Sequence, residues 1–208
     1  MSFLPEPTMC NLYSITTNQA AIIALFRVIN RYVGNLPPMP GVFPNYFAPV
    51  VRNTEAGTEL TTMRWGMPPP PRTPGPPVTN IRNPTSPHWR GWLKPESRRL
   101  VPANSFAEYA PEANPETKKK DVVWFALNED RPLFAFAGIW TTFNGDRGIK
   151  SKPIPGPHLV YGFLTTSPND VIATACDEHS APPTAPPPSS RVTFLPEAIM
   201  QRYDAKPD

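Results

Sequence analysis

Cysteine, charged residues and long apolar runs are all scarce in this chain of 208 residues. Two cysteines, Cys10 and Cys176, are too few for a disulfide framework, and four-ligand zinc spacing is absent. No apolar run approaches the roughly 18 residues that span a membrane, and residues 1–8 lack the basic and apolar regions of a secretory signal. We therefore expect a soluble, cytoplasmic protein with no metal, no cofactor and no membrane partner.

Proline, in contrast, is abundant. The 32 prolines cluster in the segments PPMPGVFP, MPPPPRTPGPP, KPIPGP and APPTAPPP, which cannot form helices or central strands. The chain has 20 basic and 17 acidic residues and a net charge of +3, which is compatible with a polyanionic partner but does not require one. The composition predicts a loop-rich α+β chain rather than a helical bundle or a series of parallel βαβ units.

The segment TTNQAAIIALFRVINRYVGN predicts an amphipathic helix that packs on a sheet. Its apolar residues, among them Ile22, Leu25 and Ile29, recur at helical spacing. Thr17 or Asn18 can cap the start of this helix, and a glycine follows its end.

Short runs rich in β-branched and aromatic residues follow the helix and predict strands. Two of them, VVWFAL and LFAFAGIW, flank the polar NEDRP and therefore predict a hairpin. The charged ETKKKD before VVWFAL predicts an exposed loop. After Asp170 only VTFL resembles a strand, so we divide the chain into a leader (residues 1–8), one domain (9–170) and a divergent, partly disordered segment (171–208).

The pair Met9-Cys10 is the first candidate for chemistry. If the chain starts at Met9, removal of that methionine gives Cys10 a free α-amine beside its thiol. The α-amine pKa of roughly 7.7–8.0 leaves a useful neutral fraction near pH 7. Such a 1,2-aminothiol attacks an aldehyde twice: the amine forms a Schiff base, and the sulfur then closes a thiazolidine. A buried cysteine without a chemical role is the alternative.

Two further clusters suit a nucleic acid. Asn80 and Arg82 lie two apart, so their side chains face the same side of an extended segment and suit a phosphate or sugar. A structural asparagine in a loop fits equally well. Arg90 stands between Trp89 and Trp92, a mixture typical of a stacking surface, although tryptophans more often lie in the core.

Glu108 is the third candidate. It stands in the sequence RRLVPANSFAEYAP between apolar and aromatic neighbours. A carboxylate in apolar surroundings has a raised pKa and can act as an acid or a base. The alternative is an ordinary surface glutamate.

Several short motifs, taken in order, resemble the SRAP family, the SOS response-associated peptidases that are also called abasic-site processing proteins. The motifs span about residues 9–169, and their shared order makes the resemblance fairly specific. The resemblance implies a single α+β domain with a β-barrel-like mixed sheet, flanking helices and long proline-rich loops. The motifs are MC (9–10), RWG (64–66), NIR (80–82), LVPANSFAEY (100–109), FAGIW (136–140) and FLTT (163–166).

The resemblance also implies roles for four catalytic residues. Cys10 would crosslink to the ring-opened sugar of an abasic site through a thiazolidine, and Asn80 would position it. Glu108 would be the acid and base of Schiff-base formation and reversal. His179 would assist ring opening, as the histidine available after the FLTT strand.

The implied partner is single-stranded DNA that contains abasic sites. Arg82 would contact its phosphates, and Trp65 and Arg90 would be further DNA contacts. The implied protein is a monomer that acts in the bacterial DNA-damage response at the nucleoid. The resemblance also suggests a second activity, a peptidase activity by which the protein processes itself.

The chain departs from the family pattern in four places, and at one of them the run PPPPRTPGPP replaces the tryptophan that often follows RWG. The opening is Cys10-Asn11-Leu12 instead of Cys-Gly-Arg, no acidic residue follows Arg82, and no Met-Pro follows His179. Two alternatives therefore stay open. One is a catalytically impaired nucleic-acid-binding remnant with a truncated or frameshifted C-terminus, and the other is a thiol peptidase that acts on other proteins.

Overall fold

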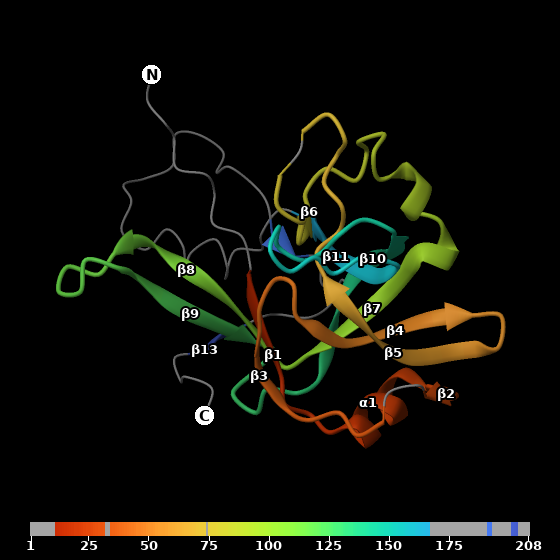
Figure 1. Ribbon diagram of the computed structural model, residues 1–208. Coiled ribbons are helices and arrows are strands. Elements are labelled where there is room, and N and C mark those ends of the chain that lie inside the picture. The colour runs from red at the N-terminus through yellow and green to blue at the C-terminus, as the bar shows by residue number, and fades with distance from the viewer. Residues whose placement is uncertain (1–10, 32–33, 74, 167–190, 193–200, 204–208) are drawn as a thin grey trace.

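Two β-sheets, one α-helix and two short 3-10 helices form the described part of the chain in this computed structural model (Figure 1). The structure describes residues 11–31, 34–73, 75–166, 191–192 and 201–203. Among these residues, no helix is both long enough and apolar enough to span a membrane. The helices are α1 (Gln19–Phe26), η1 (Arg90–Trp92) and η2 (Pro95–Ser97).

The larger sheet contains a closed barrel. Strand β11 pairs antiparallel with β10 on one side and parallel with β5 on the other, and the pairs β10–β7, β7–β4 and β4–β5 complete the circuit. The predicted β-barrel-like mixed sheet of an α+β domain is thus confirmed. The strands are β12 (Arg191–Val192), β11 (His158–Thr166), β10 (Phe134–Phe143), β7 (Arg98–Ala103), β4 (Phe47–Thr54), β5 (Gly57–Trp65) and β2 (Asn30–Arg31), with β6 (Asn80–Ile81) paired to β11.

The smaller sheet lies beside the barrel and carries the long β8–β9 arm that extends to the left in Figure 1. Each strand of this sheet pairs antiparallel with its neighbours. In order, they are β13 (Gln201–Tyr203), β9 (Lys120–Ala126), β8 (Ser105–Ala113), β1 (Leu12–Ile15) and β3 (Met39–Val42).

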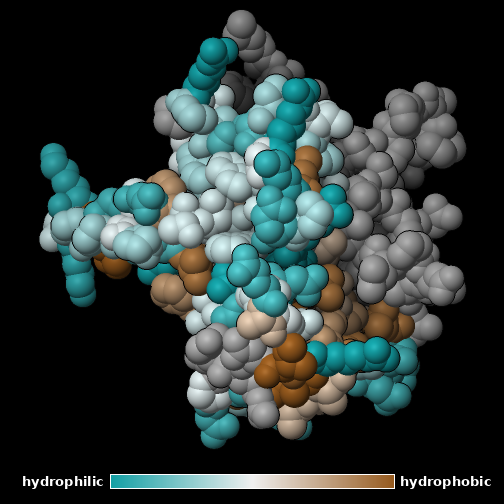
Figure 2. All heavy atoms as spheres, turned by 90° about the vertical axis from the view of Figure 1, so that its right-hand side faces the viewer, coloured by the Kyte–Doolittle hydropathy of each residue, from teal (hydrophilic) through white to brown (hydrophobic). Residues whose placement is uncertain are grey.

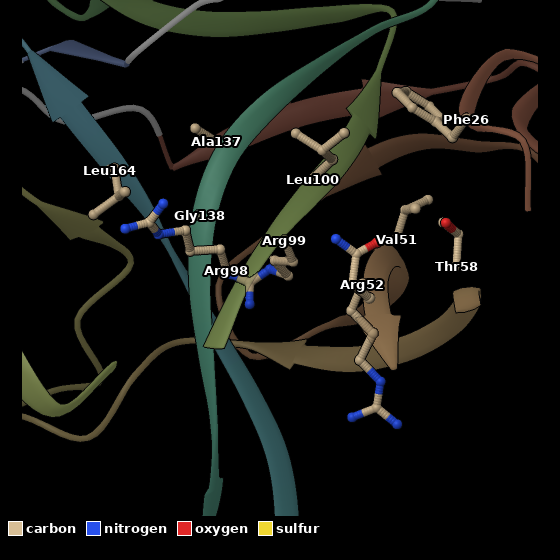
Figure 3. Close-up of a pocket in the computed structure, with 11 residues that line it drawn as sticks. Phe26, Val51, Arg52, Thr58, Arg98, Arg99, Leu100, Ala137, Gly138 and Leu164 are labelled. Atoms are coloured by element: carbon tan, nitrogen blue, oxygen red, sulfur yellow. The ribbon is translucent and has the colours of Figure 1, made fainter. Parts of the chain in front are cut away.

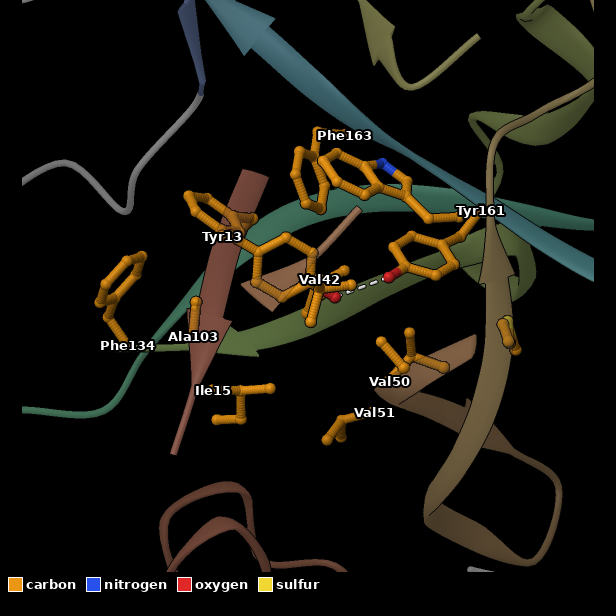
Figure 4. Close-up of a cluster of buried hydrophobic side chains, with 14 of the residues drawn as sticks. Tyr13, Ile15, Val42, Val50, Val51, Ala103, Phe134, Tyr161 and Phe163 are labelled. Carbon is orange, nitrogen blue, oxygen red and sulfur yellow. Dashed lines mark hydrogen bonds between the residues drawn. The ribbon is translucent and has the colours of Figure 1, made fainter. Parts of the chain in front are cut away.

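Aromatic rings join the two sheets in one core (Figure 4). Tyr13 of β1 stands edge-on to Trp65, Phe136 and Phe163, at centroid distances of 5.2, 5.9 and 5.6 Å. Its hydroxyl shares a 2.6 Å hydrogen bond with the hydroxyl of Tyr161, drawn as a dashed line in Figure 4. Because Tyr13 belongs to the smaller sheet and its partners belong to the barrel, these contacts fix one sheet against the other.

Asn104 holds the chain where it passes from the barrel strand β7 to β8. Its Oδ1 accepts hydrogen bonds from the backbone N–H groups of Thr16 and Thr17, at 2.9 and 3.1 Å, and its Nδ2 donates to the carbonyl of Arg131 at 2.8 Å. Asn104 is buried, so these bonds satisfy a polar side chain that would otherwise be costly to bury.

The helix is shorter than the pattern predicts. Asn18 caps its start, as predicted, by accepting from the N–H of Ala21 at 3.0 Å. The helix ends at Phe26 because Arg27 adopts a left-handed conformation (φ 51°) and the chain then enters β2 beside β5. Leu25 and Ile29, which the helical pattern places on the core face, are exposed, and Figure 2 shows apolar surface low on this face, at the height of α1.

The predicted hairpin of VVWFAL with LFAFAGIW is wrong. The first run forms β9, which pairs with β8 and places Phe106 opposite Phe125. The second run forms β10, which pairs with β7 and β11 in the barrel. The residues between them therefore cross from one sheet to the other. The charged run ETKKKD is exposed, as predicted, in the β8–β9 turn and the start of β9.

Two short strands come from the predicted C-terminal segment. Val192 of β12 pairs with Thr165 of β11, and Gln201 of β13 pairs with Ala126 of β9. Val192, the first residue of the predicted VTFL strand, belongs to β12, and residues 193–195 lie outside the described residues. The boundary at residue 170 and most of segment 171–208 lie outside the described residues.

Arg99 of β7 is a cation buried in the barrel wall. Its Nη2 donates to the carbonyl of Gly162 on β11 at 3.0 Å, and its guanidinium lies 4.6 Å from the ring centroid of Tyr161. It reaches β11 across Gly138 of β10, where a Cβ would lie 2.8 Å from Nη2. Burial lowers the pKa of Arg99 from its usual value to about 9. Arg99 and Gly138 also line a cavity of about 340 Å³ (Figure 3).

We predict that Arg99→Met raises the thermal unfolding midpoint at pH 7, with a gain of about 1 kcal/mol in stability, because methionine removes a desolvated charge at similar length. The pKa of Arg99 in the folded protein, about 9, lies well below its value in the unfolded chain, so the stability of the parent rises as the pH rises above about 9. The advantage of the variant should therefore shrink between pH 7 and pH 10. Circular dichroism melts at both pH values measure this, with the exposed neighbour Arg98→Met as control. A lower midpoint for Arg99→Met at pH 7 would contradict the prediction.

Candidate functional site

Backbone pairing with β11 places Asn80 at the edge of the barrel. In β6, Asn80 lies opposite Phe163 and Ile81 lies opposite Leu164. The N–H of Phe163 donates to the carbonyl of Thr79 at 2.8 Å, and the hydroxyl of Thr165 donates to the carbonyl of Ile81 at 3.0 Å. The side chain of Asn80 is buried, so its orientation is set by the fold rather than by solvent.

A line of hydrogen bonds links Asn80 to Asn11. The Nδ2 of Asn80 donates to the hydroxyl of Thr79 at 3.0 Å, and that hydroxyl donates to Oδ1 of Asn11 at 3.2 Å. The indole of Trp65 donates to the carbonyl of Thr79 at 3.3 Å and steadies the same residue from the core. Asn11 directly follows Cys10 in the sequence, so this line ends one residue from the predicted nucleophile.

Glu108 opens onto a small cavity that Asn11 also lines. The cavity has a volume of about 130 Å³, and its other walls include Phe43 and Tyr109. Strand pairing explains the arrangement, because β1 runs antiparallel to β8 with Leu12 opposite Ala107. Glu108 is buried, which rules out the alternative of an ordinary surface glutamate.

The structure therefore brings Asn80 of β6 and Glu108 of β8 close to Asn11. Asn80 reaches Asn11 through Thr79, and Glu108 shares the cavity with it. Cys10 and His179, the other two predicted catalytic residues, lie outside the described residues. An amide and a carboxylate held around a polar strand end can orient a nucleophile and move protons.

The three predicted DNA contacts lie in different surroundings. Arg82 is exposed directly after β6, and Arg90 is exposed at the start of η1. Trp65, in contrast, has 0% of its surface exposed and packs within the main core cluster. Because the indole is buried, no base can stack on either of its faces. Trp65 instead supports Thr79 from the core, through the hydrogen bond to its carbonyl. Trp89 is also buried, which favours the core alternative for that residue.

Sequence reasoning missed two residues of the site, Asn11 and Thr79. In the sequence, Asn11 stands out only as a departure from the family opening, and Thr79 carries no signal beyond its place directly before the Asn80 motif. Within the described ranges, no group of three histidine, cysteine, aspartate or glutamate residues lies together as a metal site would require.

We predict that Thr79→Val destabilises the protein, because valine keeps the shape but cannot join Asn80 to Asn11. The buried amide of Asn80 then loses its partner, at a cost of about 1–3 kcal/mol, whereas the exposed Asn11 can bond to water instead. Urea unfolding at pH 7 measures the loss, and Thr142→Val on the exposed face of β10 is the matched control. Equal unfolding midpoints for the parent and Thr79→Val would show that the bonded line contributes nothing to stability.

Comparisons with known proteins identify a family for this chain. The model of the family described as SOS response associated peptidase (SRAP) matches residues 9–181. A search of curated proteins finds no match.

Solved structures share the fold at low sequence identity. One is a phage-related protein from Bordetella bronchiseptica, with a TM-score of 0.59 and 18% identity over 90% of this chain and 78% of that one. Another is a protein from Bacteroides thetaiotaomicron, with a TM-score of 0.61 and 16% identity over the same shares of the two chains.

Proposed function

Because the chain belongs to the SRAP family of SOS response associated peptidases, we propose that it binds single-stranded DNA and covalently traps abasic sites through Cys10. The observation that carries this proposal is the hydrogen-bonded line from Asn80 through Thr79 to Asn11. The line holds Asn11, which follows Cys10 in the sequence and lines the same cavity as Glu108. Family membership supports the DNA-damage context.

The proposed reaction needs no oxidant and no cofactor. The α-amine of Cys10 adds to the C1′ aldehyde of the ring-opened sugar, and loss of one water molecule gives an imine. The thiol of Cys10 then adds across the C=N bond, so a carbon–sulfur bond forms and the thiol proton ends on nitrogen. The product is a thiazolidine that links the protein to the DNA strand.

Three side chains assist these steps. Asn80 positions the strand end that carries Cys10, through Thr79 and Asn11. Glu108 takes up and returns the protons of imine formation and reversal, as a buried acid or base can. His179 assists opening of the sugar ring. Arg82 and Arg90, both exposed, contact the phosphates of the strand.

We predict that Glu108→Gln slows crosslinking to an abasic single strand about 100-fold, because the amide keeps the shape but cannot exchange the proton. Binding of an undamaged strand should not change. Denaturing gels measure the crosslink, and fluorescence anisotropy measures binding. Glu112→Gln, on the exposed end of the same strand, is the matched control. Equal crosslinking by Glu108→Gln and the parent from pH 5 to pH 8 would remove Glu108 from the mechanism.

A second prediction concerns residues 1–9. An amide nitrogen is not nucleophilic, because its lone pair is delocalised into the carbonyl. A form that keeps these residues should therefore not crosslink, whereas a form that begins at Cys10 should. Self-cleavage, with Cys10 as nucleophile and Glu108 as proton shuttle, would convert the first form into the second and fits the peptidase name of the family. Intact mass spectrometry before and after reaction follows both events. Crosslinking with the leader still attached would overturn the proposed chemistry.

A further inference from the structure

Two arginines lie together on the outside of the barrel. Arg64 of β5 donates from Nη1 to the carbonyl of Arg147 at 3.2 Å, and Arg147 donates from Nη2 to the carbonyl of Gly66 at 2.7 Å. Each guanidinium also lies over an aromatic ring: Arg64 is 4.9 Å from the ring centroid of Phe47, and Arg147 is 4.5 Å from that of Phe143. Backbone carbonyls and ring faces thus hold both cations in place.

In the part of the chain that the structure describes, no carboxylate forms an ion pair with either of these arginines. The Nε atoms of both are buried without a hydrogen-bond partner among the described residues. Asp146 precedes Arg147 in the chain, but its carboxylate accepts from the N–H of Gly148 in its own loop. Burial, and then the charge of Arg64, lower the pKa of Arg147. Two cations that repel each other at a half-exposed surface would be stabilised by a bound anion.

Exposed aromatic side chains lead from this pair to the cavity of Glu108. Phe47, under Arg64, is 53% exposed, and its neighbour Tyr46 is 50% exposed. The ring of Tyr46 lies 5.6 Å from that of Phe43, and Phe43 lines the cavity. Exposed rings beside cations are typical of surfaces on which the bases of a single strand stack.

We propose that Arg64 and Arg147 form a phosphate-binding subsite for single-stranded DNA, with the exposed rings of residues 43, 46 and 47 stacking on the bases between this subsite and the cavity. The choice of DNA as the partner rests on the proposed function. The subsite is distinct from Arg82 and Arg90, and it gives the arginine of the RWG motif a role on the outer face of the strand whose inner face carries Trp65.

The test measures binding of an undamaged fluorescent (dT)20 strand by anisotropy over a series of salt concentrations. For single strands, each neutralised phosphate adds about 0.7 to the slope of log K against log[salt]. The double variant R64Q/R147Q should bind about ten-fold more weakly at low salt and lose about 0.7 of that slope. The control R98Q removes an exposed arginine whose Nε donates to a carbonyl, and it should bind like the parent.

A charge-conserving variant separates the role in binding from a role in folding. R64K should keep the salt slope of the parent, and circular dichroism melts show whether each variant is folded. If R64Q/R147Q unfolds, R64Q alone should still show weaker binding and a shallower slope. A folded R64Q with the slope and affinity of the parent would overturn the subsite, and so would a parent that does not bind (dT)20.

Crosslinking is measured separately, with an abasic strand. If the variants have a shallower salt slope than the parent but the parent does not crosslink, the subsite is supported and the proposed function is contradicted. Crosslinking by the parent with an unchanged slope in R64Q supports the function and overturns the subsite.

Discussion

The position of β11 is the constraint on which the rest of the structure depends. This strand pairs in parallel first with β5, where Tyr161 lies opposite Trp65, and then with β6, where Phe163 lies opposite Asn80. The first pairing closes the barrel, and the second holds Asn80 at its edge. Trp65 reinforces both, because its indole packs in the core and donates to the carbonyl of Thr79. The same strand therefore both closes the barrel and positions the site.

The two faces of β5 serve different purposes. The inner face buries Trp65 against the aromatic core, while the outer face carries Arg64 over Phe47. The smaller sheet completes the site, since Asn11 precedes β1 and Glu108 lies on its neighbour β8. The Tyr13–Tyr161 hydrogen bond and the rings around it keep that sheet against the barrel. A substitution in the core is thus expected to affect the site by shifting the strands that carry its residues, rather than by direct contact with those residues.

The sequence predicted the fold class and part of the site because those features depend on local patterns. Short apolar runs between proline loops indicated a loop-rich α+β chain, the family resemblance implied the barrel-like sheet, and the structure confirms both. Asn80 and Glu108 stood in recognisable motifs, and both are buried. Asn80 is joined to Asn11 through Thr79, and Glu108 lines a cavity together with Asn11. Asn11 and Thr79 escaped notice because their importance comes from strands far apart in the chain.

The predictions that failed also depend on pairing between strands that are far apart in the chain. The helical pattern continued past Phe26, but pairing of β2 with β5 took over the following residues. The runs VVWFAL and LFAFAGIW are neighbours in sequence, yet each pairs with an earlier strand in a different sheet. Trp65 stood in a motif that suggested a DNA contact, and only the closed barrel shows that its ring is inside. Local patterns do not carry information on pairing between distant strands.

The most direct test of the account identifies the atoms that join protein and DNA. The form that begins at Cys10 would be incubated with an abasic single strand, without a reducing agent, and digested with nuclease and protease. Mass spectrometry of the adducted peptide should then place the sugar on the N-terminal peptide, with fragments that locate it at Cys10 and a mass that corresponds to loss of one water molecule. An adduct on a lysine, or one that is recovered only after borohydride reduction, would contradict capture of the abasic site by the amine and thiol of Cys10.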